Sequence, residues 1–206
     1  MKSNRLLNLT RQASLGFMLS LAAVAAAPWL PAPLTALTGL RMAYAQSATD
    51  VPAAYASHFT QAKKMGEATL RWYGLKVYDA QLWSEKAPQQ FNYRTDRHVL
   101  ELKYDKSLDG DKIAEKSREE IEEQGVGTPP VLQQWQKKLT EIMPNVQNGT
   151  RLAAVFVPGK GFLLYRDGQL HAEVNDPDLA TAFMGIWLDP KSSQPKLREK
   201  LIGLRK

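Results

Sequence analysis

Residues 68–83, ATLRWYGLKVYDAQLW, form a long stretch rich in aromatic residues, which predicts a β-strand. Strict alternation along this stretch would mix apolar and charged side chains on the same face. A glycine inside a strand often marks a β-bulge, and a bulge at Gly74 changes the face to which the following residues point. With that bulge, one face carries Leu70, Trp72, Leu75 and Val77, and the other carries Arg71, Tyr73, Lys76 and Tyr78.

The second of these faces combines two cations with two phenols, which suits an anionic head group. An arginine can bind a carboxylate through two parallel hydrogen bonds, and a phenol can donate another. We therefore predict a ligand-binding set made of Arg71, Tyr73, Lys76 and Tyr78. The alternative is that this face is simply the solvent-exposed side of an amphipathic strand.

Three further stretches predict strands, and four predict helices. The strands are expected at 98–104, 151–157 and 161–174, the last interrupted by a hairpin turn at 167–168. The helices are expected at 111–124, 130–143, 177–187 and 193–204. Asp176 followed by Pro177 is typical of a helix start. Strands first, with helices between and after them, predict an α+β fold with a mostly antiparallel sheet.

Residues 1–45 have the pattern of a secretory signal peptide. They combine a basic start, an apolar run at 13–27 and a final Ala-Tyr-Ala at 43–45. The alternative is a retained membrane anchor, but prolines interrupt the apolar run before it reaches the ~20 residues that a span requires. We expect cleavage after Ala45, with no stable membrane anchor left, a flexible lead-in at 46–58 and one folded domain at 59–206.

The formal net charge of +6 first suggests a nucleic-acid partner. Four of the 27 Lys and Arg residues lie in 1–45, however, and that segment has no acid. The rest of the chain therefore carries 23 bases against 21 acids, and the two signs are interspersed along 111–124. This near-neutral domain excludes nucleic-acid binding as the expected function.

The sequence carries none of the common catalytic or metal-binding motifs. It has no cysteine, which excludes disulfides and thiolate metal sites. His58, His98 and His171 lie far apart, and none has a second ligand at metal-binding spacing. There is no phosphate-binding loop, dinucleotide-binding glycine motif or nucleophile elbow. We therefore predict no metal, no cofactor and no catalytic residue.

Several segments match those of one known family, in the same order and at similar spacing. They are GEATLR at 66–71 running into GLKVYDA at 74–80, GDKIAEKS at 110–117, AFMGIWLDP at 182–190 and SQPKLR at 193–198. Together they resemble the chalcone isomerase-like family, in particular its secreted bacterial branch. The resemblance implies a large antiparallel sheet, a layer of helices on one side and an apolar cleft between the two.

The resemblance also implies two kinds of activity. Plant members close a chalcone to a flavanone without a cofactor, and other members bind fatty acids through an arginine and a tyrosine. Arg71 matches the arginine of both activities with an offset of one residue. Ile113 and Glu120 fall where the plant isomerases have a tyrosine and an asparagine. Isoleucine donates no hydrogen bond, and a carboxylate opposes a developing enolate.

The residues and the resemblance together favour a periplasmic, non-catalytic protein. Its expected partner is an apolar and anionic small molecule, such as a fatty acid. One alternative is an isomerase or lyase that acts on a chalcone-like enone. A second alternative is a structural or interaction protein of the cell envelope, with a completely filled core.

Overall fold

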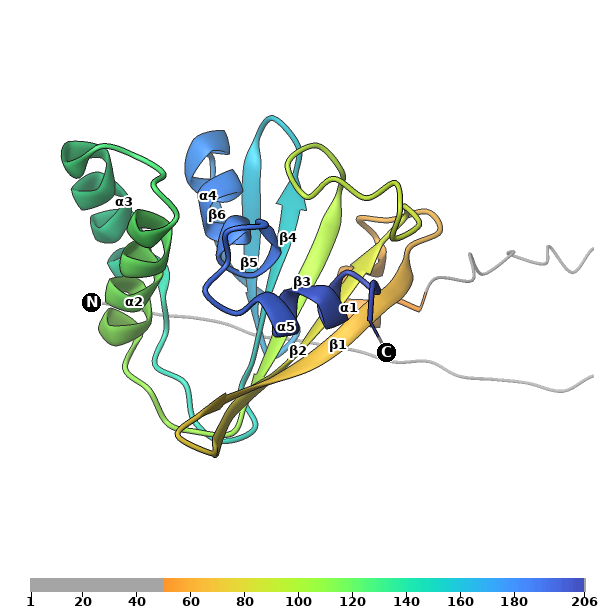
Figure 1. The fold of residues 1–206 in the computed structure, drawn as a ribbon, viewed down its shortest axis with the longest axis horizontal. Helices are drawn as coiled ribbons and strands as arrows, with labels where there is room; N and C mark the ends of the chain where they lie inside the picture. Colours follow the sequence, from red (N-terminus) through yellow and green to blue (C-terminus); the bar gives the residue numbers. More distant parts are fainter. Residues whose placement is uncertain (1–49, 206) are drawn as a thin grey trace, which may run out of the picture. The chain divides into compact units, whose positions relative to one another are not determined.

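The computed structural model describes residues 50–205, which form a six-stranded sheet and several helices (Figure 1). Neighbouring strands are all antiparallel and lie side by side in chain order. The strands are β1 Lys63–Trp72, β2 Leu75–Ser84, β3 His98–Tyr104, β4 Arg151–Val157, β5 Gly161–Arg166 and β6 Gln169–Val174. The predicted α+β fold with an antiparallel sheet is confirmed. The predicted signal peptide lies outside the described residues.

The prediction of one bulged strand at 68–83 is wrong. The stretch is a hairpin, in which β1 ends at Trp72 and β2 begins at Leu75. Tyr73 and Gly74 have φ angles of 46° and 80°, so both adopt the left-handed conformation of a tight two-residue turn. Aromatic and apolar residues continue up to and after the turn, so the sequence pattern did not indicate a break between two strands. Residues after Gly74 therefore belong to a second strand. The predicted sorting of faces holds next to the turn, where Trp72 pairs with Leu75 and Arg71 pairs with Lys76. It fails at Tyr78, which pairs with Leu70 beyond a shift in register.

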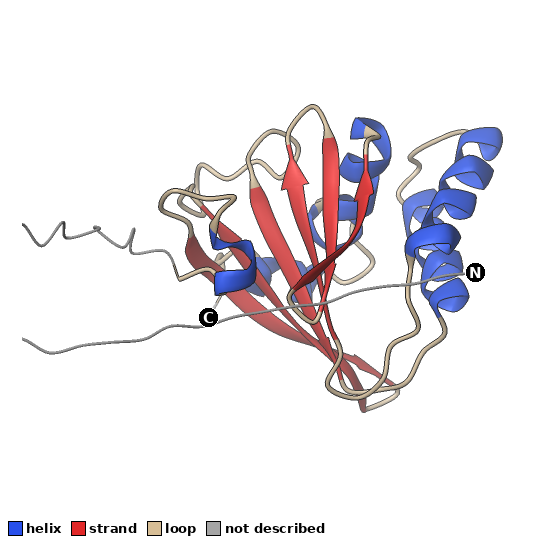
Figure 2. Ribbon diagram, turned by 180° about the vertical axis from the view of Figure 1, so that it is seen from behind, coloured by secondary structure: helices blue, strands red, loops and turns tan. Residues whose placement is uncertain are grey.

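Four helices cover one face of the sheet (Figure 2). They are α2 Gly110–Glu123, α3 Pro129–Ile142, α4 Pro177–Leu188 and α5 Pro195–Leu201. All four were predicted within a few residues. The side chain of Asp176 accepts a hydrogen bond from the amide of Leu179 at 3.0 Å, as expected for an N-cap.

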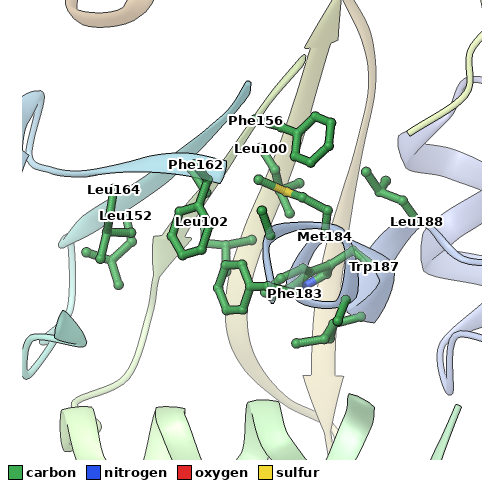
Figure 3. Close-up of a cluster of buried hydrophobic side chains, with 14 of the residues drawn as sticks. Leu100, Leu102, Leu152, Phe156, Phe162, Leu164, Phe183, Met184, Trp187 and Leu188 are labelled. Carbon is green, nitrogen blue, oxygen red and sulfur yellow. The ribbon is translucent and has the colours of Figure 1, made fainter. Parts of the chain in front are cut away.

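Helix α4 lies at the centre of the core and is apolar on nearly all sides. Nine of its 12 residues are buried. Phe183 stacks on Phe162 of β5 with ring centroids 5.0 Å apart, and Figure 3 shows the side chains of α4 and the strands directed toward each other. On its other side, α4 is joined to the end of α2 because the Gln124 amide donates to the carbonyl of Gly185 at 3.1 Å. The helix layer is thus organised around α4.

Helix α5 lies directly against the edge strand β1. A Cβ atom at Gly66 would stand 1.9 Å from the carbonyl oxygen of Lys200. Only a glycine allows the two backbones to approach this closely. Because a strand Cβ points out of the sheet, this contact places α5 on the face of the sheet at its first strand.

The opposite face of the sheet has a smaller core of its own. The short helix α1, Ala53–Ala56, places Tyr55 against Tyr165, and Val51 and Phe59 are buried beside them. The Tyr55 hydroxyl donates to Glu101 at 2.8 Å, and the other oxygen of Glu101 pairs with Arg151. The predicted flexible lead-in, 46–58, is therefore packed over the part that the structure describes. Its flexibility was inferred from its content of Ala, Ser and Thr, which obscures the two buried residues Val51 and Tyr55.

Across residues 50–205, no helix has the length and apolar character needed to cross a membrane.

His98 is sealed in the core and makes the stability of the fold sensitive to acid. Its Nδ1–H donates to the backbone oxygen of Asp96 at 2.8 Å, and its Nε2 has no partner among residues 50–205. Burial lowers the pKa of His98 from 6.5 to about 4. The unfolded chain therefore takes up this proton first, and stability is lost as pH falls from about 6.5 to about 4.

We predict that the free energy of unfolding falls by about 3 kcal/mol across this window, measured by urea titration at a series of pH values. His98→Asn should remove most of the slope, even if it lowers stability throughout. His171→Asn, at an exposed position, is the matched control and should keep the slope. Equal slopes for His98→Asn and the unchanged protein would show that His98 does not cause the effect.

Candidate functional site

An apolar cavity of about 370 Å³ opens between the β1–β2 hairpin, the end of β3 and the helices α2 and α4. Leu70, Trp72 and Val77 line it from the hairpin, and Ile113, Ile186 and Trp187 line it from the helices. This is the cleft between sheet and helices that the resemblance implied. Its size is within the usual range for a small-molecule site, and its walls are mainly hydrophobic, as such sites are.

Two tyrosines provide the polar groups at the sheet side of the cavity. Tyr78 lies on β2, and Tyr104 lies opposite it in the register of β3, with ring centroids 5.7 Å apart. The oxygen of Tyr78 accepts a hydrogen bond from Trp187 Nε1 at 2.9 Å. Its own proton makes no hydrogen bond within residues 50–205. Burial raises the pKa of both phenols, so both remain neutral donors at ordinary pH.

Tyr104 is the more unusual of the two residues. Its side chain is almost fully buried, yet its hydroxyl forms no hydrogen bond to any described residue. Among the described residues, His98 Nε2 is the side-chain polar atom that is fully buried and has no partner. The Tyr104 hydroxyl also has no partner there, so it is not fully buried. A buried donor is costly when it stays unpaired. The Tyr104 hydroxyl is therefore accessible from the cavity and free to bind its contents.

The helix side of the cavity carries charges that largely compensate each other. Lys116 pairs with Glu120 at 3.1 Å and with Glu119 at 3.3 Å, and Glu120 also accepts from Ser193 at 2.6 Å. Lys112 pairs with Glu115 at 2.8 Å. Of these residues, Lys112, Lys116, Glu120 and Ser193 line the cavity. Either lysine can exchange its surface ion pair for a ligand anion at small cost, because exposed pairs are weak.

A small apolar void of about 40 Å³ lies behind the cavity. The two spaces share four wall residues, namely Tyr104, Ile113, Ser117 and Trp187. Phe183 and Met143 of the core also line the void.

Of the four predicted ligand-binding residues, the structure places only Tyr78 in the cavity wall. Tyr73 is 91% exposed at the hairpin turn. Arg71 is exposed and donates to the carbonyl of Gly74 at 3.2 Å, beside the cavity and outside its lining. Lys76 pairs with Asp79 at 2.6 Å and with Asp105 at 3.2 Å. These four side chains do not gather because Tyr73 lies in the turn, and because a shift in register beside Arg71 places Tyr78 opposite Leu70, on the face away from Arg71 and Lys76.

Sequence reasoning missed Tyr104, which could have been found from periodicity. Alternation along 98–104 puts Leu100, Leu102 and Tyr104 on the same face, and Tyr104 is the last of them, at the end of the strand. Ile113 and Glu120 are seven residues apart, which places them two turns apart on one face of α2. Both line the cavity, as the alignment with the plant isomerases implied.

The three histidines lie at separate places and not at this cavity. His98 is in the core, His58 contacts the hydroxyl of Tyr165 at 2.6 Å, and His171 donates to the carbonyl of Ile142 at 3.1 Å. Within residues 50–205, no three acidic or histidine side chains are grouped so that they could hold a metal ion.

Comparisons with known proteins agree with this architecture. Residues 51–203 match a family model described as chalcone isomerase-like. An uncharacterized protein of Haemophilus influenzae is 30% identical over 151 residues, which cover 73% of each chain. The crystal structure of a fatty-acid binding protein of Arabidopsis thaliana superposes with a TM-score of 0.50 at 10% identity, covering 69% of this chain and 87% of that one. The cleft, the sheet order and these matches lead to one conclusion: the chain belongs to the chalcone isomerase-like family.

Proposed function

We propose that this protein is a non-catalytic binder of an apolar small molecule whose head group accepts hydrogen bonds, such as a fatty acid. The observation that carries the proposal is the hydroxyl of Tyr104, a buried residue of the apolar cavity wall, which forms no hydrogen bond to any described residue. Tyr78 offers a second phenol beside it. A carboxylate that accepts from both hydroxyls would form short, charge-assisted hydrogen bonds.

The apolar walls would supply most of the binding free energy. Burial of hydrocarbon contributes roughly 25 cal/mol per Å² of apolar surface, before the costs of association are subtracted. An acyl chain fits walls made of leucine, isoleucine, valine and tryptophan. The fold is shared with a fatty-acid binding protein of Arabidopsis thaliana, which makes this ligand class the first to test.

The charge of the head group would be balanced from α2. Lys112 and Lys116 line the cavity, whereas the guanidinium of Arg71 is directed to the hairpin backbone. The proposal therefore assigns the head group to the two tyrosines and these lysines. Arg71 would contribute only an exposed positive charge beside the cavity, which solvent and salt screen.

To test this assignment, we predict that Tyr104→Phe weakens fatty-acid binding about tenfold, because one charge-assisted hydrogen bond is lost. The fold should be unaffected, since the hydroxyl has no partner in it. Arg71→Ala is the matched comparison and should change the affinity less than about threefold. Calorimetric titration of purified, delipidated protein with palmitate gives both values.

Two outcomes would contradict this assignment. If Arg71→Ala abolishes binding while Tyr104→Phe binds normally, the head group lies outside the cavity. If palmitate does not bind and mass spectrometry finds no stoichiometric lipid in protein from its native host, the fatty-acid proposal is wrong.

The absence of catalysis is part of the proposal and has its own reason. Ile113 and Glu120 line the cavity, and the resemblance aligns them with a tyrosine and an asparagine of the plant isomerases. Glu120 would raise the energy of an enolate formed near it. We expect the absorbance of a chalcone solution to decay at the spontaneous rate when the protein is added. A faster decay that Tyr104→Phe slows would instead establish an isomerase.

We also propose that the protein acts in the periplasm, after removal of a signal peptide. The support is the basic start, the short apolar run and the small residues before Gln46. N-terminal sequencing of protein from the native periplasmic fraction should begin at Gln46. Recovery of the uncleaved chain from the membrane fraction would favour a retained anchor.

A further inference from the structure

The turn of the β1–β2 hairpin carries an unusual group of exposed apolar side chains. Trp72 is 58% exposed, Tyr73 is 91% exposed and Leu75 is 61% exposed. These are three of the six large hydrophobic side chains that are exposed among residues 50–205, and they lie within four positions. The turn lies at one end of the sheet, at the lower left in Figure 1. We call Trp72, Tyr73 and Leu75 the hairpin tip.

Tyrosine is unfavourable in the backbone conformation that Tyr73 adopts. Its φ of 46° lies in the left-handed region, where a tight turn before glycine favours asparagine, aspartate or glycine. The tyrosine ring gains little in return, since its ring contact is with Trp72, at 5.3 Å between centroids. Folding does not require this ring. A residue kept in a strained position without a role in folding points to a role in binding.

The charges next to the hairpin tip are positive. Residues 70–78 contain Arg71 and Lys76 and no acid. Lys76 is already neutralised by Asp79 and Asp105, but Arg71 makes no ion pair with any described carboxylate. Its guanidinium is therefore available to a phosphate, which it can bind through two parallel hydrogen bonds.

The hairpin tip also adjoins the cavity. Trp72 belongs to both, because its side chain lines the cavity and is exposed at the turn. A partner bound to the hairpin tip would therefore lie next to the part of the cavity wall that Leu70 and Trp72 form.

We propose that the hairpin tip docks on the surface of a phospholipid bilayer that contains anionic lipids. Tryptophan and tyrosine are the residues that favour the boundary between head groups and acyl chains, and leucine adds buried apolar area. Arg71 would pair with lipid phosphates. The evidence for docking is the hairpin tip and the adjacent Arg71, and it does not depend on the proposed function. The purpose of docking does depend on it: an acyl ligand could pass between the bilayer and the cavity with little exposure to water.

A second copy of the chain is a less suitable occupant. Stable interfaces bury about 800 Å² on each partner. Two aromatic side chains and one leucine, partly buried already, fall well short of that area. A weak and reversible lipid contact needs no such extent, because a bilayer provides an apolar phase that a few side chains can enter.

The test uses the full chain, which has no cysteine and can be labelled at one introduced position. An environment-sensitive fluorophore is attached at Tyr73→Cys, or at Leu170→Cys as the matched control, because Leu170 is 56% exposed on β6. Vesicles contain phosphatidylcholine and phosphatidylglycerol in equal parts, or phosphatidylcholine alone. We expect a blue shift at position 73 with the anionic vesicles, a smaller one with phosphatidylcholine alone, and none at position 170. Equal responses at the two positions would overturn the proposal.

A double variant, Tyr73→Asn with Leu75→Ser, separates docking from folding and from ligand binding. It leaves Trp72 in the cavity wall and gives the turn its preferred Asn-Gly sequence. Vesicle co-sedimentation should weaken about tenfold relative to the unchanged chain, in which residues 1–49 are the same. The melting temperature should hold or rise, and the palmitate affinity should not change.

The remaining outcomes are equally decisive. Undiminished co-sedimentation of the double variant would overturn docking. A blue shift at position 73 that appears without vesicles and grows with protein concentration would identify self-association instead. If palmitate fails to bind but the vesicle results are as expected, the proposed function is wrong and the docking surface remains.

Discussion

The structure depends on one packing constraint, which is the burial of α4 on nearly all sides. A helix that is apolar all round has to be covered by other elements, because no single face of it can remain in water. The sheet covers one side through contacts such as Phe162 with Phe183. The end of α2 covers another through Gln124 and Gly185, and α5 follows directly in the chain. Each of these contacts fixes the position of a neighbouring element.

The cavity is a consequence of the same arrangement. At the last turn of α4, Trp187 reaches the sheet and donates to Tyr78. This contact fills the space only in part, so that Tyr104 and the first half of α2 remain separated by a cavity. A tighter core would have left the Tyr104 hydroxyl sealed and unsatisfied, at a cost in stability. The alternative of an envelope protein with a completely filled core does not agree with this geometry.

Much of the fold could be predicted from local patterns. The helix limits were close because caps and glycines act over a few residues, as Asp176 does for α4. Strand β3 was found from alternation, β4 from its β-branched residues, and β5 and β6 from the Asp-Gly turn between them. The error at Gly74 arose because the local sequence around this glycine fits a β-bulge as well as a turn. Only the pairing of β1 with β2 distinguishes them, and pairing is not a local property.

By itself, the sequence determined the class of fold, the family resemblance and the mixture of aromatic and basic side chains along 68–83, because these follow from residue type and spacing. The tertiary structure decided which residues share a site. Tyr78 and Tyr104 are 26 positions apart, yet strand register brings them together at the cavity. Arg71 and Tyr73 are close to Tyr78 in the chain, but Tyr73 lies in the turn, and Arg71 lies on the face opposite to Leu70, the partner of Tyr78. Neighbours in space are set by register and helix packing, which depend on the whole chain at once.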